Sequence, residues 1–149
     1  MEKLILVRCG SHGNGYRLSE IGKRKMEMIT EKLGVFVNGH PIAIFCSPAR
    51  RARESAQILS LFFKVDYEEH IFLRTDSAGL VENFDKTIEL ISSRENVGTF
   101  IAVTHNCFLS NFPEYFAWKS MKMKLHSKPV DNGQAWVIDP KEKTLIHVK

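Results

Sequence analysis

The sequence predicts an α/β fold, a three-layer α/β/α sandwich with a mostly parallel central sheet. Three short apolar runs, at 4–8, 41–45 and 99–103, have the length and composition of buried strands. Amphipathic helical segments alternate with these runs, which is typical of a parallel sheet that helices cover on both faces. The 149 residues fit one domain, 1–149, with a substantial core.

Two segments between the apolar runs have the periodicity of core-facing helices. The first covers 18–33 and has Ser19 as its predicted cap. The second covers 47–63, with Ser47 as the cap and Pro48 at the first helical position. The residues expected to face the core are Ile21, Met28, Ile29 and Leu33 in the first helix, and Ala52, Ala56, Leu59 and Phe63 in the second.

The remaining segments complete the sandwich. A weaker strand candidate at 65–73 precedes a polar loop at 74–79. A third helix is expected over about 81–94, with Phe84, Ile88 and Ile91 on one face. The C-terminal 134–148 is typical of two strands joined by a turn at Asp139.

Composition and charge exclude several functional classes. The net charge is +4, but basic and acidic residues are interspersed, which gives nucleic-acid binding no support. Three widely spaced cysteines argue against a disulfide framework and predict a cytoplasmic protein. No apolar run is long enough for a signal peptide core or a membrane span. No Cys/His pair has the spacing of metal ligands, so we expect neither a metal nor a cofactor.

Polar residues follow each of the three apolar runs. Arg8 and Cys9 follow the first, Ser47 and then Arg51 follow the second, and His105 follows the third. In open α/β sheets, ligands bind beyond the carboxyl ends of the strands. Two guanidinium groups, a histidine and a helix N-terminus that converge there predict an anion-binding pocket.

The same segments resemble motifs of the histidine phosphatase superfamily, the phosphoglycerate-mutase-like group, and are most similar to small bacterial phosphohistidine phosphatases. "LILVRCG" resembles a strand that ends in Arg-His-Gly, and "YRLSEIGKRKM" resembles a Leu-Thr/Ser-x-x-Gly helix start. "FCSPARRARESAQIL" is similar to Ser-Ser-Pro-x-x-Arg-Ala, and "FIAVTHN" to a strand that ends in Val-Ser/Thr-His. The four matches occur in the expected order and cover most of the chain.

This resemblance implies a phosphate pocket made by Arg8, Arg51 and His105. It also places Cys9 where the family has its nucleophilic histidine, so phosphatase activity is expected to be weak or lost. The family's proton donor is an acidic residue in the loop after the third strand. That position aligns with Arg74 here, which leaves Asp76 and Glu82 as the nearest substitutes.

Three functions remain open at this point. The protein binds a phosphorylated small molecule or phosphoprotein with little turnover, or it is an active phosphatase, or it is a non-catalytic binding or regulatory module. An active phosphatase would use Cys9 or a relocated histidine such as His12, although no Cys-x5-Arg loop is present. A non-catalytic module would use a surface such as "EYFAWKSMKMK", a segment equally typical of a core-packed helix.

Four further expectations concern residues around this pocket. The neighbouring arginines should lower the pKa of the Cys9 thiol. Cys46 and Cys107 should be small core residues. Arg50 and Arg53 should point to solvent on either side of Arg51, and His12 should be a solvated loop residue.

Overall fold

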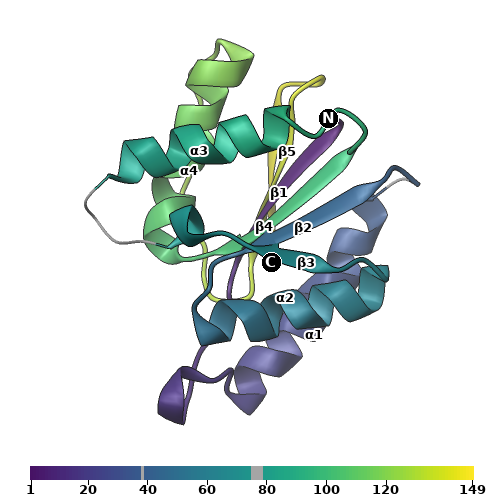
Figure 1. Cartoon of the computed structure of the whole chain (residues 1–149), viewed down its shortest axis with the longest axis vertical. Coiled ribbons are helices and arrows are strands. Elements are labelled where there is room, and N and C mark those ends of the chain that lie inside the picture. The colour runs from purple at the N-terminus through teal and green to yellow at the C-terminus, as the bar shows by residue number, and fades with distance from the viewer. Residues whose placement is uncertain (38, 75–78) are drawn as a thin grey trace.

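A computed structural model describes residues 1–37, 39–74 and 79–149, and Figure 1 shows their arrangement. Six strands form one sheet in the order β3-β2-β4-β1-β5-β6. The strands are β1 (Lys3–Arg8), β2 (Ile42–Cys46), β3 (Tyr67–Glu69), β4 (Thr99–Thr104), β5 (Ala135–Asp139) and β6 (Thr144–Val148). The first four are parallel, and β5 and β6 extend the sheet in antiparallel pairing. The predicted α/β/α sandwich with a mostly parallel sheet is confirmed.

Four α-helices cover the two faces of this sheet. They are α1 (Glu20–Leu33), α2 (Arg50–Phe63), α3 (Leu80–Ser92) and α4 (Asn106–Met121), and short 3-10 turns lie at Asn14–Tyr16, Gly34–Phe36 and Ile71–Leu73. The pair α1 and α2 lies on one face, and α3 and α4 lie on the other (Figure 1).

Strand β1 explains why the predicted strands are apolar throughout. Leu4 and Leu6 pack into the core beneath α3 and α4, whereas Ile5 and Val7 pack into the core beneath α1 and α2. Successive side chains of a strand point to opposite faces, so a sheet covered on both sides needs apolar residues at every position. The short run therefore serves two cores.

The core face of α1 differs from the prediction. Ile29 and Leu33 are buried as expected, but Ile21 and Met28 are exposed, and Gly22 and Met26 take the core positions. Gly22 contacts the loop after β1 so closely that an added Cβ would lie 2.3 Å from the carbonyl oxygen of Ser11. This close approach rotates α1 and points Ile21 to solvent. The predicted cap is confirmed, because the Ser19 hydroxyl accepts a hydrogen bond from the Gly22 N–H at 3.0 Å.

Helix α2 begins two residues later than the prediction. Its cap is Ala49, in extended conformation, and the first helical residue is Arg50 rather than Pro48. Ser47 lies two residues before the cap, where its hydroxyl accepts a hydrogen bond from the Ala49 N–H at 3.3 Å and contacts His105 Nε2 at 2.8 Å. The delay leaves Arg51 on the first turn of α2, beside the carboxyl end of the sheet.

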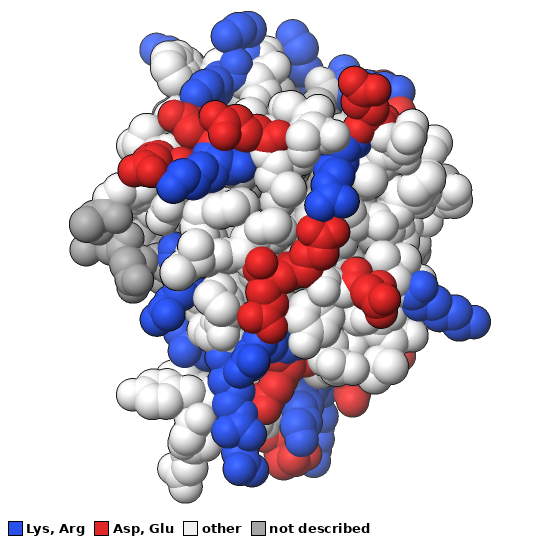
Figure 2. All heavy atoms as spheres, in the orientation of Figure 1, with Lys and Arg blue, Asp and Glu red and all other residues white. Residues whose placement is uncertain are grey.

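The charged surface agrees with the mixed pattern of the sequence. Figure 2 shows basic and acidic side chains interspersed over the face that Figure 1 presents. The phosphate backbone of a nucleic acid binds where basic side chains gather.

Within the described ranges, no helix combines the length and the apolar character that a membrane crossing requires.

Candidate anion-binding site

A cavity of about 460 Å³ opens at the carboxyl ends of β1, β2 and β4, and we call it the strand-end pocket. Its lining comes from the loop after β1, the first turn of α2, the first turn of α4 and the turn before β5. The lining residues are Arg8, Cys9, Ser11, His12, Arg51, His105, Asn106, Cys107 and Asn132. The sheet register explains the convergence, because Arg8 pairs directly with Thr104, the residue before His105.

His105 is the buried centre of the strand-end pocket. Arg51 Nη2 lies 3.2 Å from His105 Nδ1, and His105 Nε2 lies 2.8 Å from the Ser47 hydroxyl. A guanidinium can only donate, so Nδ1 accepts from Arg51 and carries no proton. The ring proton is therefore on Nε2 and is donated to Ser47. This contact fixes the orientation of the imidazole.

The other polar groups of the strand-end pocket favour a bound anion. Arg8 Nη1 donates to the carbonyl oxygen of Val130 at 2.6 Å, which leaves further N–H groups of its fork for a ligand. The helix α4 starts at the pocket, and the His105 side chain does not cap it. The first backbone N–H groups of a helix attract negative charge. No carboxylate is among the described lining residues, so none of them offsets the positive charge of the two arginines.

Cys9 is buried, with 2% of its surface exposed. Burial raises the pKa of its thiol, and this effect outweighs the opposing effect of Arg51 and Arg8. The expectation of a lowered pKa is wrong, because the cost of burying a thiolate exceeds the attraction of the two guanidinium groups. Cys9 Sγ lies 3.5 Å from His105 Nδ1, so this thiol is a weak partner of the same nitrogen that Arg51 contacts.

The backbone beyond Cys9 is not a phosphate-binding loop of the cysteine phosphatase kind. The Cys9 N–H donates to the Thr104 carbonyl at 3.0 Å, and the Gly10 N–H donates to the Ser55 hydroxyl at 3.1 Å. A loop that wraps a phosphate needs successive amides directed at the anion. Here these amides bind the protein itself, in agreement with the missing Cys-x5-Arg spacing.

The remaining predicted residues occupy different environments. His12 is exposed at the edge of the strand-end pocket, as expected for a loop residue, and Arg50 and Arg53 are exposed on α2. Cys46 is buried as predicted, and burial raises its pKa to about 12. Cys107 is not a core residue, because the first turn of α4 exposes it at the pocket.

The candidate proton donors receive no support from the described residues. Arg74 and Glu82 are both exposed, and neither lines the strand-end pocket. Glu82 forms an ion pair with Lys86 at 2.7 Å. Asp76 lies outside the residues that the structure describes. In the described ranges, no three His, Cys, Asp or Glu side chains gather as metal ligands.

Sequence reasoning missed Asn132, whose side-chain amide donates to the Cys9 carbonyl at 3.1 Å. This contact joins two residues that are far apart in the chain, and Asn132 lies in a segment without helical or strand periodicity. The available signal is the Asn132-Gly133 pair, a turn motif in which Gly133 has a φ of 69°. It predicts a turn, and the pairing of β1 with β5 is needed to place that turn beside Cys9.

Comparisons with known proteins identify the fold. No family model matches the sequence, and no curated protein matches it. Solved structures of the histidine phosphatase superfamily do match, and the chain has their fold.

Three of these structures illustrate the likeness. The putative phosphohistidine phosphatase SixA from Agrobacterium tumefaciens has a TM-score of 0.66 at 16% identity, over 99% of this chain and 95% of that one. SixA from Nakamurella multipartitia has a TM-score of 0.72 at 14% identity, over 92% and 83%. A phosphoserine phosphatase variant from Entamoeba histolytica, in complex with phosphoserine, has a TM-score of 0.68 at 16% identity, over 100% and 96%.

Proposed function

We propose that this protein binds phosphorylated ligands in the strand-end pocket and has weak or no phosphatase activity. The observation that carries the proposal is the convergence of Arg8, Arg51 and His105 on a cavity without a carboxylate in its described lining. Guanidinium forks match phosphate oxygens in geometry and charge. The ligand is a phosphorylated small molecule or a phosphoprotein. The solved structures support this class, because one holds phosphoserine and two are named putative phosphohistidine phosphatases.

Weak activity follows from the state of Cys9. Attack by its sulfur would form an S–P bond and break the bond from phosphorus to the leaving group, which then needs a proton. The thiol must first lose its own proton, and burial raises its pKa. The nearest base in contact is His105 Nδ1 at 3.5 Å, and Arg51 already donates to that nitrogen. The raised pKa and the hydrogen bond from Arg51 to Nδ1 both hinder loss of the thiol proton, which must precede attack on phosphorus.

The same contact favours one second candidate, an active phosphatase that uses Cys9. A phosphate that drew Arg51 away from His105 would free Nδ1 to accept the thiol proton. This route requires Cys9 to reach phosphorus from a position that suits a longer imidazole, and a misplacement of about 1 Å costs roughly a hundredfold in rate. We therefore rank it below binding with little turnover.

Turnover and binding measured on the same protein test the proposal. We expect calorimetry to detect inorganic phosphate binding by the unmodified chain, with little hydrolysis of p-nitrophenyl phosphate. The variant Cys9→His should form a phosphohistidine at position 9, which mass spectrometry of quenched samples detects. Rapid hydrolysis by the unmodified chain that Cys9→Ser abolishes would establish the second candidate. A folded protein that binds no phosphate would refute both.

We also propose that residues 1–149 act as one domain in the cytoplasm, without a cofactor. The two hydrophobic cores lie on opposite faces of one sheet and share its strands. No boundary in the described residues therefore separates one core from the other. The free cysteines agree with a reducing compartment. Limited proteolysis tests the first point, because a single domain should yield one resistant fragment that contains both chain ends.

A further inference from the structure

The net charge of the chain is concentrated in one segment, residues 119–128. Four of the 21 Lys and Arg side chains lie there, and none of the 17 acidic ones does. The rest of the chain therefore carries equal numbers of both, and these four lysines account for the net charge of +4. Figure 2 shows basic side chains gathered at its upper end, where Figure 1 places the end of α4.

An alternating pattern aligns the basic side chains of this segment. Lys122, Lys124, His126 and Lys128 are exposed. The residues between them are partly buried and include apolar side chains that pack against the core beneath α3 and α4. Successive residues of an extended chain point to opposite sides, so the four exposed side chains form one row. We call this row the basic track.

The segment runs back along α4 toward the strand-end pocket. Helix α4 begins at the pocket and ends at Met121, the end remote from it. The Met123 N–H donates to the Ala117 carbonyl at 3.2 Å. Further along, the Ser127 N–H donates to Glu114 Oε1 at 2.9 Å. The later residue of the segment thus contacts the earlier residue of α4, so the segment is antiparallel to the helix.

The basic track ends beside the strand-end pocket. Arg8, which lines the pocket, donates to the Val130 carbonyl at 2.6 Å. Lys128 lies two residues before Val130, about 7 Å of extended chain, and Lys122 lies about 20 Å further back. A small phosphoester in the pocket cannot reach Lys122. A polypeptide that carries the phosphoryl group can follow the whole track.

The lysines of the basic track are available to a ligand. Within the described residues, none of Lys122, Lys124 and Lys128 forms an ion pair with a carboxylate. Lys119, which precedes the track, contacts Asp85 and is not part of it. Positive charge that the protein does not neutralise attracts an acidic ligand.

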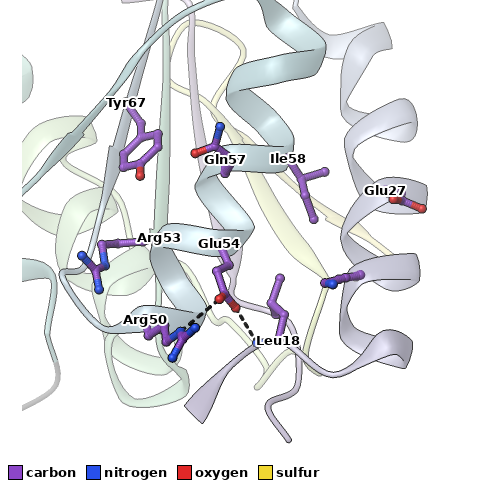
Figure 3. Close-up of a pocket in the computed structure, with 9 residues that line it drawn as sticks. Leu18, Glu27, Arg50, Arg53, Glu54, Gln57, Ile58 and Tyr67 are labelled. Atoms are coloured by element: carbon purple, nitrogen blue, oxygen red, sulfur yellow. Dashed lines mark hydrogen bonds and ion pairs between the residues drawn. The ribbon is translucent and has the colours of Figure 1, made fainter. Parts of the chain in front are cut away.

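The exposed basic side chains of α2 differ, because carboxylates accompany them. Arg50 Nε contacts Glu54 at 3.1 Å, and Glu54 also accepts the Leu18 N–H at 2.6 Å (Figure 3). Arg53 Nη1 lies 3.9 Å from Glu69. The cavity that these arginines line therefore combines both signs of charge, and it attracts an acidic ligand less than the basic track does.

The spacing of the basic track favours a polypeptide as its ligand. An extended polypeptide presents every second side chain on one side, so its carboxylates can repeat at the same interval as the lysines. A single-stranded nucleic acid stacks its bases on aromatic side chains, and residues 122–130 include none. A membrane surface takes up exposed apolar side chains, whereas Met123 and Leu125 pack against the protein core.

We propose that the basic track is the docking surface for an extended acidic segment of the phosphorylated partner. Acidic residues at alternate positions of that segment contact Lys128, Lys124 and Lys122 in turn, starting near the phosphorylated side chain. The inference rests on the proposed function, since the phosphoryl group occupies the strand-end pocket. It selects a phosphoprotein over a small phosphoester.

Fluorescence anisotropy at low salt with labelled phosphopeptides tests this inference. The probes carry phosphoserine at the N-terminal or the C-terminal end, then two spacer residues, then glutamate at four alternate positions. Matched probes carry glutamine in place of glutamate. At least one glutamate probe should bind roughly fivefold more tightly than its glutamine match, because several exposed ion pairs form together. The gain should disappear in about 1 M salt, where the Debye length is about 3 Å.

Two double variants with equal changes in charge show where the probe binds. The variant with Lys122→Gln and Lys124→Gln should lose most of the gain. The control with Lys23→Gln and Lys64→Gln removes the same charge from α1 and the end of α2, on the opposite face of the sheet, and should keep the gain. All four lysines are exposed, so both variants should unfold thermally like the unmodified chain. Equal losses in the two variants, or no gain for either probe direction, would overturn the docking surface.

Other ligands separate the remaining outcomes. Inorganic phosphate that fails to bind the unmodified chain would refute the proposed function, whereas phosphate binding without a gain from glutamate would overturn the docking surface alone. Vesicles of phosphatidylserine and phosphatidylcholine, and a single-stranded oligonucleotide with a terminal phosphate, should bind more weakly than the best glutamate probe. Tighter binding of either one, lost in the variant with Lys122→Gln and Lys124→Gln, would overturn the choice of a polypeptide.

Discussion

Replacing Arg51 with alanine is the most direct test of whether the strand-end pocket binds the proposed anion. Arg51 extends from the first turn of α2 and uses Nη2 to contact His105, so most of its fork remains available to phosphate oxygens. A hydrogen bond to a charged group contributes about 1.5–3 kcal/mol. Loss of one such contact therefore weakens phosphate binding roughly ten- to a hundredfold.

The structure supplies a matched control for this substitution. Arg53 lies two residues along α2 and points to solvent, so Arg53→Ala removes the same charge without a contact in the pocket. Calorimetric titration with inorganic phosphate at one fixed salt concentration compares the three proteins. We expect Arg51→Ala to lose affinity and Arg53→Ala to match the unmodified chain. Equal affinities of Arg51→Ala and the unmodified chain, or equal losses in both variants, would refute the assignment of Arg51.

Three other predictions concern the surroundings of the pocket. Iodoacetamide should modify exposed Cys107 first and buried Cys46 and Cys9 much later, because burial raises the pKa of both buried thiols; peptide mass spectrometry gives the order, and early labelling of Cys9 would contradict it. Ser47→Ala leaves the buried Nε2–H of His105 without its hydroxyl acceptor, so calorimetry should show severalfold weaker phosphate binding that Ser47→Thr partly restores; unchanged affinity in the alanine variant would exclude this role. Burial raises the pKa of Glu54, but the Leu18 N–H and Arg50 together lower it by more, so the pKa in the folded protein lies below the ordinary 4.5. The ionised carboxylate therefore stabilises the fold above pH 4.5, and this stabilisation is lost as the pH falls through the lower folded pKa. Thermal unfolding of Glu54→Gln against the unmodified chain should show a difference at pH 7 that shrinks below pH 4.5, and a constant difference would refute it.

The sequence predicts Arg8, Arg51 and His105 together because strand ends are local features with a fixed geometric consequence. Each residue follows an apolar run, and parallel strands bring their carboxyl ends to one edge of a sheet. The register bears this out, with Arg8 opposite Thr104 and Cys46 opposite Val103. No knowledge of side-chain packing is needed for this step.

The errors concern quantities that depend on packing. Neighbouring arginines are visible in the sequence, but the burial that reverses their effect on the pKa of Cys9 is not. Cys107 is exposed because it lies on the side of α4 that faces the pocket. The sequence does not reveal which side that is, because α4 has apolar residues around most of its circumference. Similarly, Ile21 is exposed because Gly22 contacts the loop after β1. Contacts of this kind join segments that are far apart in the sequence, so the hydrophobic periodicity of one segment does not predict them.

The backbone around Cys9 bears on the proposal that this protein binds phosphate with weak or no turnover. The N–H groups of Cys9 and Gly10 are held by Thr104 and Ser55, and an added Cβ on Gly10 would lie 2.7 Å from the Leu18 side chain. This packing fixes the position of residue 9, so the chain cannot move forward to compensate for a side chain shorter than histidine. Of the residues proposed to bind phosphate, Arg51 lies on α2, His105 follows β4, and Arg8 ends β1 directly before residue 9. We therefore expect the shorter side chain of Cys9 to keep its sulfur back from a bound phosphorus, while Arg8, Arg51 and His105 keep their places at the pocket.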